Sequence, residues 1–329
     1  MKKLKLIKTS GLLVIIIITS LVYSNHFDNP FFFDDSHTIE NNTAITSLSD
    51  WTSFFTDAKT FSSLPANRAY RPMITLMNAI DYKIAGGLDS KYYHYHIFFW
   101  YLLAIVLFFF LTHYLFKKSF ENDGNQLSIL IGALITTLFF AVHTINAETI
   151  NYICARSDSF STLCVIASLL LFINKSTRKY HIYLLTMIVG ILTKQTAVMF
   201  VPILFVFIIL FEEGVKIKDF KKSAIIISLF YITFIAFKIL FEDTMQIKYF
   251  YAQFLIEMVR VMILFVPVFF FYKFFLKDRL QIKDLKKITI NAMTLTALVG
   301  GGLFLFNQLY LTPKSTVSVN LTVTKFEYI

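Results

Sequence analysis

Two adjacent acidic residues, Asp34 and Asp35, follow the aromatic residues 31–33 shortly after the first long apolar segment. A carboxylate at this place could deprotonate an acceptor hydroxyl or hold a divalent cation. Two like charges this close, partly desolvated, would raise the pKa of one carboxyl group, which suits a general base. Spacing alone favours a simpler interpretation, an acidic turn or helix cap in a polar loop.

Two cations occur where a lipid phosphate could reach them. Arg71 directly precedes Pro72 at the expected start of a helix. Arginine binds phosphate through two parallel hydrogen bonds, and a helix amino terminus adds a favourable dipole. Ordinary headgroup contact is an equal alternative for Arg71. Lys194 lies between two short apolar segments. A lone lysine at a membrane interface usually extends to water, and phosphate binding is the sharper alternative.

Another polar group spans the end of the third apolar segment and the start of the fourth. It contains His143, Glu148, Arg156 and Asp158. His143 and Glu148 are five residues apart, so a continuous helix would not align them, but a break near Asn146 would let both face one cavity. An acid, a base and a cation grouped at a membrane edge indicate a functional site. A capped, polar helix connection is an equally open interpretation.

The elements that carry these residues are predicted to be membrane helices. Of the 329 residues, 56% are hydrophobic and 16% are charged, whereas a soluble domain is roughly a quarter charged. Apolar runs of about eighteen residues can cross the hydrocarbon core as helices. The predicted spans lie near residues 6–24, 96–116, 127–145, 160–174, 180–193, 196–211, 223–241, 252–272 and 288–309. The fifth and sixth could instead form one long helix, and charge alternation favours two.

Basic residues predict the orientation. Alternate ends and connections, beginning with residues 1–8, hold 19 Lys and Arg, and the opposite set holds 10 although it is longer. Cytoplasmic loops carry the excess of Lys and Arg, so we expect a cytoplasmic amino terminus. The same clustering between apolar segments argues against nucleic-acid binding as the meaning of the net charge of +10.

Residues 25–95 form the largest predicted outer loop. Behind Pro72, apolar residues recur at helical spacing, which predicts an amphipathic helix lying along the membrane surface. Its expected apolar face consists of Met73, Ile74, Met77, Ile80 and Ile84. His94 and His96 are expected to point in opposite directions on a strand, which argues against a shared metal.

The order of these motifs resembles a known family. The sequence runs Phe-x-x-Asp-Asp at 31–35, Tyr-Arg-Pro at 70–72, His94 before the second span, Ala-Val-His-Thr-Ile-Asn-Ala-Glu at 141–148, Ala-Arg-Ser-Asp at 155–158 and Thr-Lys-Gln-Thr-Ala at 193–197. Over residues 1–211 it resembles the membrane half of the transmembrane-and-TPR O-mannosyltransferases and their bacterial relatives, in the GT-C class of glycosyltransferases. Family members often carry a second His where this chain has Asn146.

The resemblance implies a transferase that takes a sugar from a polyprenyl-phosphate carrier at the outer face. It implies that the first outer loop supplies the catalytic acid, Asp34, with Asp35 beside it to orient it or to help bind a cation. The positions that it implies for substrate binding are Arg71, His94, His143, Glu148, Arg156, Asp158 and Lys194.

We therefore expect an all-α polytopic membrane protein of GT-C type, a single domain over residues 1–329. Its expected partners are membrane lipids, the lipid-linked sugar and a protein or glycan acceptor, in a bacterial inner membrane with the active face outside. A divalent cation is the one cofactor that the residues could accept. A flippase, or an inactive fragment or binding subunit, is the alternative. The end at Ile329, without a TPR domain, leads us to expect a truncated chain.

Overall fold

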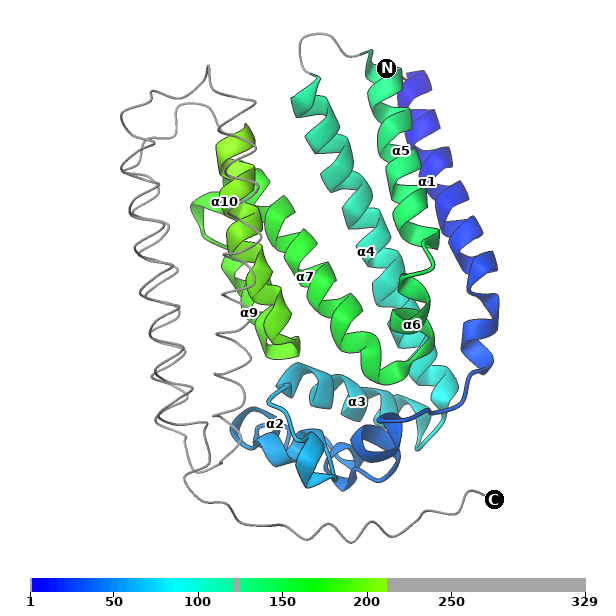
Figure 1. The fold of residues 1–329 in the computed structure, drawn as a ribbon, viewed down its shortest axis with the longest axis vertical. Coiled ribbons are helices and arrows are strands. Elements are labelled where there is room, and N and C mark those ends of the chain that lie inside the picture. The colour runs from blue at the N-terminus through cyan, green and yellow to red at the C-terminus, as the bar shows by residue number, and fades with distance from the viewer. Residues whose placement is uncertain (1, 121–124, 212–329) are drawn as a thin grey trace, which may run out of the picture. The chain divides into compact units, whose positions relative to one another are not determined.

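The computed structural model describes residues 2–120 and 125–211, and every regular element in these ranges is a helix (Figure 1). These residues lie within the first of two compact units, Met1–Phe254. The all-helical expectation is confirmed for this part of the chain. The predicted spans 223–241, 252–272 and 288–309 lie outside the described residues, so the total of nine and the single domain stay predictions.

Within the described residues, three helical segments are long and apolar enough to cross a membrane. They are α1 (Lys2–Val22), α4 (Ser90–Ser119), and α7 (Arg156–Ile173) together with the turn η6 (Ile153–Ala155) that precedes it. The shorter apolar helix α5 (Gln126–Val142) matches the predicted third span. These helices indicate an integral membrane protein. Helix α4 begins earlier than predicted because the Asp89 carboxylate accepts the Lys91 N–H and caps its first turn.

The connection from α5 to α7 contains the predicted break. Helix α5 ends at Val142, His143 is extended, and the short helix α6 (Asn146–Asn151) follows. The Asn146 side chain donates to the Phe140 carbonyl at 2.6 Å. That bond satisfies one of the carbonyl groups that the last turn of a helix leaves open. Asn146 therefore stabilises the break by satisfying the end of α5.

Residues 183–211 form two helices rather than one. After α8 (Lys175–Lys179), the chain continues through α9 (Tyr183–Thr193), an extended Lys194, η7 (Gln195–Met199) and α10 (Phe200–Phe211). The predicted interruption at Lys194 is confirmed. With eleven residues, α9 rises only about 16 Å, roughly half the hydrocarbon thickness. Gly190 lets α9 approach its neighbours, because a Cβ there would meet the Cβ atoms of Cys164 and Ala197 at 2.9 and 3.1 Å.

The predicted outer loop is ordered as a chain of short helices that ends in one longer helix. They are η1 (Ser24–Asp28), η2 (Ser36–Glu40), η3 (Thr43–Thr46), α2 (Ser53–Thr56), η4 (Ala58–Phe61), η5 (Pro65–Asn67) and α3 (Pro72–Ala85). Pro72 occupies the first turn of α3, as predicted, and Gly86 ends the helix with φ of 72°. Glycine suits that left-handed position because it has no Cβ.

Helix α3 runs across the ends of the long helices (Figure 1). Ile74 and Met77 of its predicted apolar face are buried in a cluster with Ala104 of α4 and Phe160 and Leu163 of α7. Ile84, at the far end of the same face, is 65% exposed. The prediction of an amphipathic helix is confirmed in its first half, while its place along a membrane surface stays a prediction.

The described helices have two chemically different ends. The basic residues of the first turns of α1, the last turn of α4 and the short helix α8 belong to one end. The loop elements and α3 cover the other end (Figure 1). There the Tyr101 hydroxyl of α4 donates to the Ala141 carbonyl near the end of α5 at 2.8 Å. The predicted site residues are carried by this second end.

Candidate functional site

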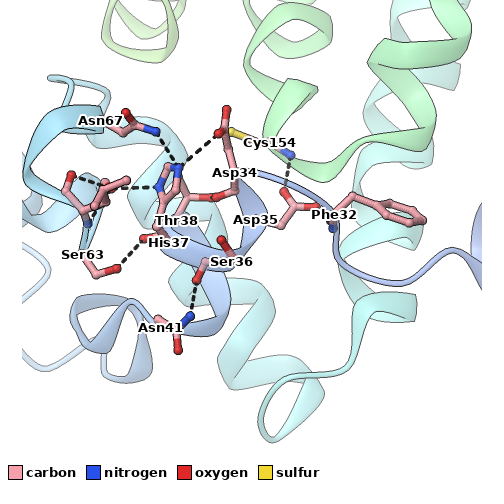
Figure 2. Close-up of polar contacts among 12 residues, drawn as sticks. Phe32, Asp34, Asp35, Ser36, His37, Thr38, Asn41, Ser63, Asn67 and Cys154 are labelled. Carbon is pink, nitrogen blue, oxygen red and sulfur yellow. Dashed lines mark hydrogen bonds and ion pairs between the residues drawn. The ribbon is translucent and has the colours of Figure 1, made fainter. Parts of the chain in front are cut away.

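The acidic pair is divided between two environments. Asp35 is fully buried: its Oδ1 accepts the Cys154 N–H at 2.8 Å and its Oδ2 accepts the Phe32 N–H at 3.0 Å. The Asp34 side chain is 56% exposed. Figure 2 shows Asp35 directed toward Cys154 while Asp34 extends toward His37 and Asn67. Asp34 is thus the carboxylate that a substrate can reach.

Burial raises the pKa of Asp35 from its ordinary value of 3.8 to about 6. The two backbone hydrogen bonds and the positive charge of Arg156 oppose this rise, and the negative charge of Glu40 adds to it. Repulsion between the two carboxylates, together with partial desolvation, was expected to raise the pKa of one of them. Desolvation is the largest cause for Asp35, and the charges that act on its pKa are those of Arg156 and Glu40.

A strained turn directly precedes the two carboxylates. Phe33 has a φ of 44°, a left-handed conformation that costs a side chain with a Cβ roughly 1–2 kcal/mol. Its ring is 87% exposed and meets the edge of Tyr152 at 6.2 Å between centroids. The Tyr152 hydroxyl accepts the Asp34 N–H at 3.0 Å. Tyr152 therefore anchors both residues from the connection between α6 and η6.

His37 supports the exposed acid. Its Nε2 lies 3.1 Å from Asp34 Oδ1 and 2.8 Å from Asn67 Nδ2, and its Nδ1 lies 2.9 Å from Ser62 Oγ (Figure 2). The imidazole is only 13% exposed. His37 was not among the predicted site residues. The signal was its position three residues after Asp34, which places both side chains on one face of a helical turn.

A layer of buried charges lies beneath α3. Arg156 Nη1 is 2.6 Å from Asp81 Oδ2, and each side chain is 1% exposed. His96 Nδ1 lies 2.5 Å from Asp81 Oδ1. The Arg156 guanidinium also lies over the Tyr93 ring, 5.5 Å from its centroid. Arg156 is thus a buried counter-ion, and it does not reach a surface where a lipid phosphate would bind directly.

Asp81 and His96 were missed by sequence reasoning. An acid four residues after Met77, on the inward face of an amphipathic helix, was the available signal. His96 lies in α4, so its expected strand geometry is wrong; two residues apart on a helix, His94 and His96 still diverge.

Lys194 is paired with a second predicted residue. Its Nζ lies 2.5 Å from Asp158 Oδ1, and the two side chains are 22% and 45% exposed. Lys194 follows α9 and Asp158 belongs to the first turn of α7. The structure therefore brings two of the candidate residues together in a partly exposed ion pair, from segments 36 residues apart.

Arg71, His94, His143 and Glu148 lie away from this contact network. Arg71 is half-buried over the Phe61 ring, and its buried Nε has no hydrogen-bond partner among the described residues. His94 is fully buried, with its Nε2 3.0 Å from the Asn29 carbonyl oxygen. His143 Nδ1 accepts the Ile145 N–H, and Glu148 is exposed. Among the described residues, no hydrogen bond or ion pair joins these four side chains to the acidic pair, so their substrate roles stay predictions.

The residues fit a divalent cation poorly. Both oxygens of Asp35 already accept backbone N–H groups. Within the described part of the chain, no group of three His, Cys, Asp or Glu side chains is placed to hold a metal ion. Six to eight oxygen ligands are usual for Ca²⁺, and Mg²⁺ prefers six. Asp34 and Asp35 are therefore assigned no bound cation in the proposed reaction.

Comparison with known proteins finds relatives for about half of the chain. The mouse protein O-mannosyl-transferase TMTC4 is 29% identical over 168 residues, which cover 49% of this chain and 22% of that protein; human TMTC4 gives the same values. Protein O-mannosyl-transferase tmtc2 of Xenopus laevis is 30% identical over 166 residues, 49% of this chain and 18% of that protein. The matched stretch thus spans about a fifth of the length of these curated relatives.

No protein-family model matches the chain. No solved structure matches it either. The resemblance drawn from the motifs is confirmed: along about half of its length, the chain is a distant homologue of the TMTC O-mannosyltransferases.

Proposed function

We propose that this protein is a GT-C-type membrane glycosyltransferase that moves a sugar from a polyprenyl-phosphate donor to an acceptor hydroxyl. The observation that carries the proposal is the exposed Asp34 carboxylate, fixed by Tyr152 and His37 beside a buried acid. A distant homology to O-mannosyltransferases over half of the chain supports the reaction class.

In the proposed reaction, Asp34 takes the proton of the acceptor hydroxyl. The acceptor oxygen then bonds to the anomeric carbon of the sugar, and the bond from that carbon to the carrier phosphate breaks. The electron pair leaves with the phosphate, and the proton ends on Asp34. A general base in reach of the attacking hydroxyl contributes roughly 10²- to 10⁴-fold to such a step.

The negative charge of the leaving phosphate needs a cation in the transition state. Of the three predicted cations, Arg71 and Lys194 remain partly accessible. Lys194 would exchange its contact with Asp158 for the phosphate. Arg156 is enclosed with Asp81, so its proposed part is indirect: its charge opposes the rise in the Asp35 pKa and so favours the ionised form of that buried acid.

The sidedness of the reaction is part of the proposal. The basic turns of α1, α4 and α8 belong to the end opposite the acidic pair. Since basic clusters favour the cytoplasmic side, we place Asp34 on the outer face, in a bacterial inner membrane. A flippase would need ionisable residues within the membrane. Glu257 and Arg260, in the predicted span 252–272, would favour that alternative, and they lie outside the described residues.

The test is sugar transfer by the purified full chain in lipid nanodiscs from synthetic polyprenyl-phosphate sugars. We expect Asp34→Asn to lower turnover by roughly 10²- to 10⁴-fold with the folded yield unchanged. Asp28→Asn is the matched control, because Asp28 is an 80% exposed acid of the same loop. Full activity of Asp34→Asn would show that Asp34 is not the general base. No transfer by any variant would favour transport or binding.

A further inference from the structure

His37 has two ring nitrogens fixed by different partners. Ser62 Oγ accepts the Leu64 N–H at 3.1 Å and lies 3.2 Å from the Leu64 carbonyl oxygen. Its distance to His37 Nδ1 is shorter, 2.9 Å, so the hydroxyl donates to Nδ1 and leaves the ring hydrogen on Nε2. This arrangement orients the imidazole and directs Nε2 toward Asp34.

The contact between Nε2 and the carboxylate needs a hydrogen between them. Nε2 lies 3.1 Å from Asp34 Oδ1, and two acceptors at that distance would repel each other. With a hydrogen in place, the bond is charge-assisted and holds one oxygen of the carboxylate. The other oxygen of Asp34 has no hydrogen-bond partner among the described residues and belongs to a half-exposed side chain.

We propose that His37 is a positioning residue for Asp34. The imidazole binds Oδ1 through Nε2 and leaves the second oxygen directed to the acceptor hydroxyl. Ser62 keeps the ring from rotating away, and Asn67, with its amide turned by 180°, offers its oxygen to the same Nε2–H. The role in catalysis rests on the proposed function, whereas the Asp34–His37 contact can be measured without it.

Two substitutions separate positioning from other roles. In His37→Gln, the amide nitrogen can reach the place of Nε2 and donate to Asp34. In His37→Asn, the shorter side chain reaches only the place of Nδ1, next to Ser62. We expect His37→Asn to lower kcat by roughly 10- to 100-fold with KM nearly unchanged, because an interaction used in the transition state is lost. His37→Gln should restore kcat to within about fivefold of the parent.

Double substitution provides a further test. In the Asp34→Asn background, His37→Asn should cause no additional loss, because residues that act as a unit are not additive. Additive losses would overturn the positioning role. Equal loss in His37→Gln and His37→Asn would also overturn it, since His37 would then act as a proton acceptor itself. Full activity of His37→Asn would overturn it directly.

A measurement without substrate decides the contact. The chain has seven histidines, which can be labelled with ¹⁵N in their rings. Asp34→Asn should move the ring resonances of the histidine that is missing in His37→Gln, while Asp28→Asn leaves the resonances of that histidine in place. If the parent transfers no sugar, the proposed function fails. The resonance comparison then still tests whether Asp34 and His37 are in contact. Unchanged His37 resonances in Asp34→Asn would overturn the inference.

Discussion

Two regions meet at the peptide bond between Asp34 and Asp35. The exposed corner, formed by Phe33, Asp34 and His37, offers a half-exposed carboxylate held by an imidazole. The buried layer, formed by Asp35, Asp81, Tyr93 and Arg156, is enclosed beneath α3, and each of its members is at most 1% exposed. The two neighbouring aspartates thus lie in opposite environments: Asp34 is hydrated and Asp35 is desolvated.

The difference shows how environment assigns roles to identical side chains. Desolvation makes ionisation of Asp35 costly, so its place is secured by two backbone N–H groups. Asp34 keeps its hydration and remains available to a substrate. A buried charge also demands a partner, which the ion pair of Arg156 and Asp81 supplies within the same layer. The following predictions test this contrast, beginning with the largest effect.

Removing one partner of the buried ion pair should cost the most stability. Asp81→Asn leaves the Arg156 guanidinium buried without a countercharge, which we expect to lower the free energy of unfolding by about 3–5 kcal/mol. The measurement is denaturant-induced unfolding in mild detergent. The double variant Asp81→Leu with Arg156→Met should recover most of the loss, since it leaves no buried charge. A loss below about 1 kcal/mol for Asp81→Asn would show that water reaches the layer.

Asp35 should give the fold a distinct pH dependence. Its pKa is near 6 in the folded state against 3.8 ordinarily, so the folded state holds the proton more tightly. Stability from this group is therefore fully present below about pH 4 and is lost as pH rises to about 6, by up to about 3 kcal/mol. Unfolding free energies of the parent and Asp35→Asn, compared at pH 4 and 7, measure this difference. If the free energies of unfolding of the two proteins differed by the same amount at both pH values, the predicted pH dependence would be wrong.

The strained turn of the exposed corner should respond to glycine. Phe33→Gly removes the Cβ at a φ of 44° and should be about 1 kcal/mol more stable than Phe33→Ala, since relief of strain exceeds the added chain entropy. Both variants lose the contact with Tyr152, so the comparison isolates the backbone. Thermal unfolding of the two proteins measures the effect. Equal stability would mean that the turn relaxes in both.

The partly exposed ion pair should contribute least to stability. Lys194→Met removes a cation that is 22% exposed and paired with a 45% exposed Asp158. Solvent screening limits such pairs to about 1 kcal/mol or less. The same unfolding measurement applied to Lys194→Met and Asp158→Asn checks this. A loss as large as that of Asp81→Asn would remove the distinction between exposed and buried pairs.

Sequence reasoning found the elements that local patterns encode. The apolar runs predicted α1, α4 and α5, and Pro72 with the spacing of Ile74 and Met77 predicted α3. The breaks at Asn146 and Lys194 were also predicted. These features depend on periodicity, capping and lengths of apolar chain, which act over a few residues. Helix α9 begins at Tyr183, three residues later than the predicted span, because residues 180–182 form a turn.

Sequence also singled out Asp34 and Asp35 but could not tell them apart. The N–H of Cys154, a residue 119 positions away, binds Asp35, while Asp34 stays exposed. Likewise, Arg156 looked like a free cation until α3 brought Asp81 against it. Contacts across such separations depend on packing, which no local pattern records.

By itself, the sequence determined a helical membrane chain, the polar residues at one end of its helices and the likeness to O-mannosyltransferases. The tertiary structure alone decided which acid is exposed, which arginine is enclosed and which histidine supports the carboxylate. The physical reason is that hydrophobic length and helix breaks are local properties of the chain. Desolvation and pairing of charges are instead properties of the space in which distant segments meet.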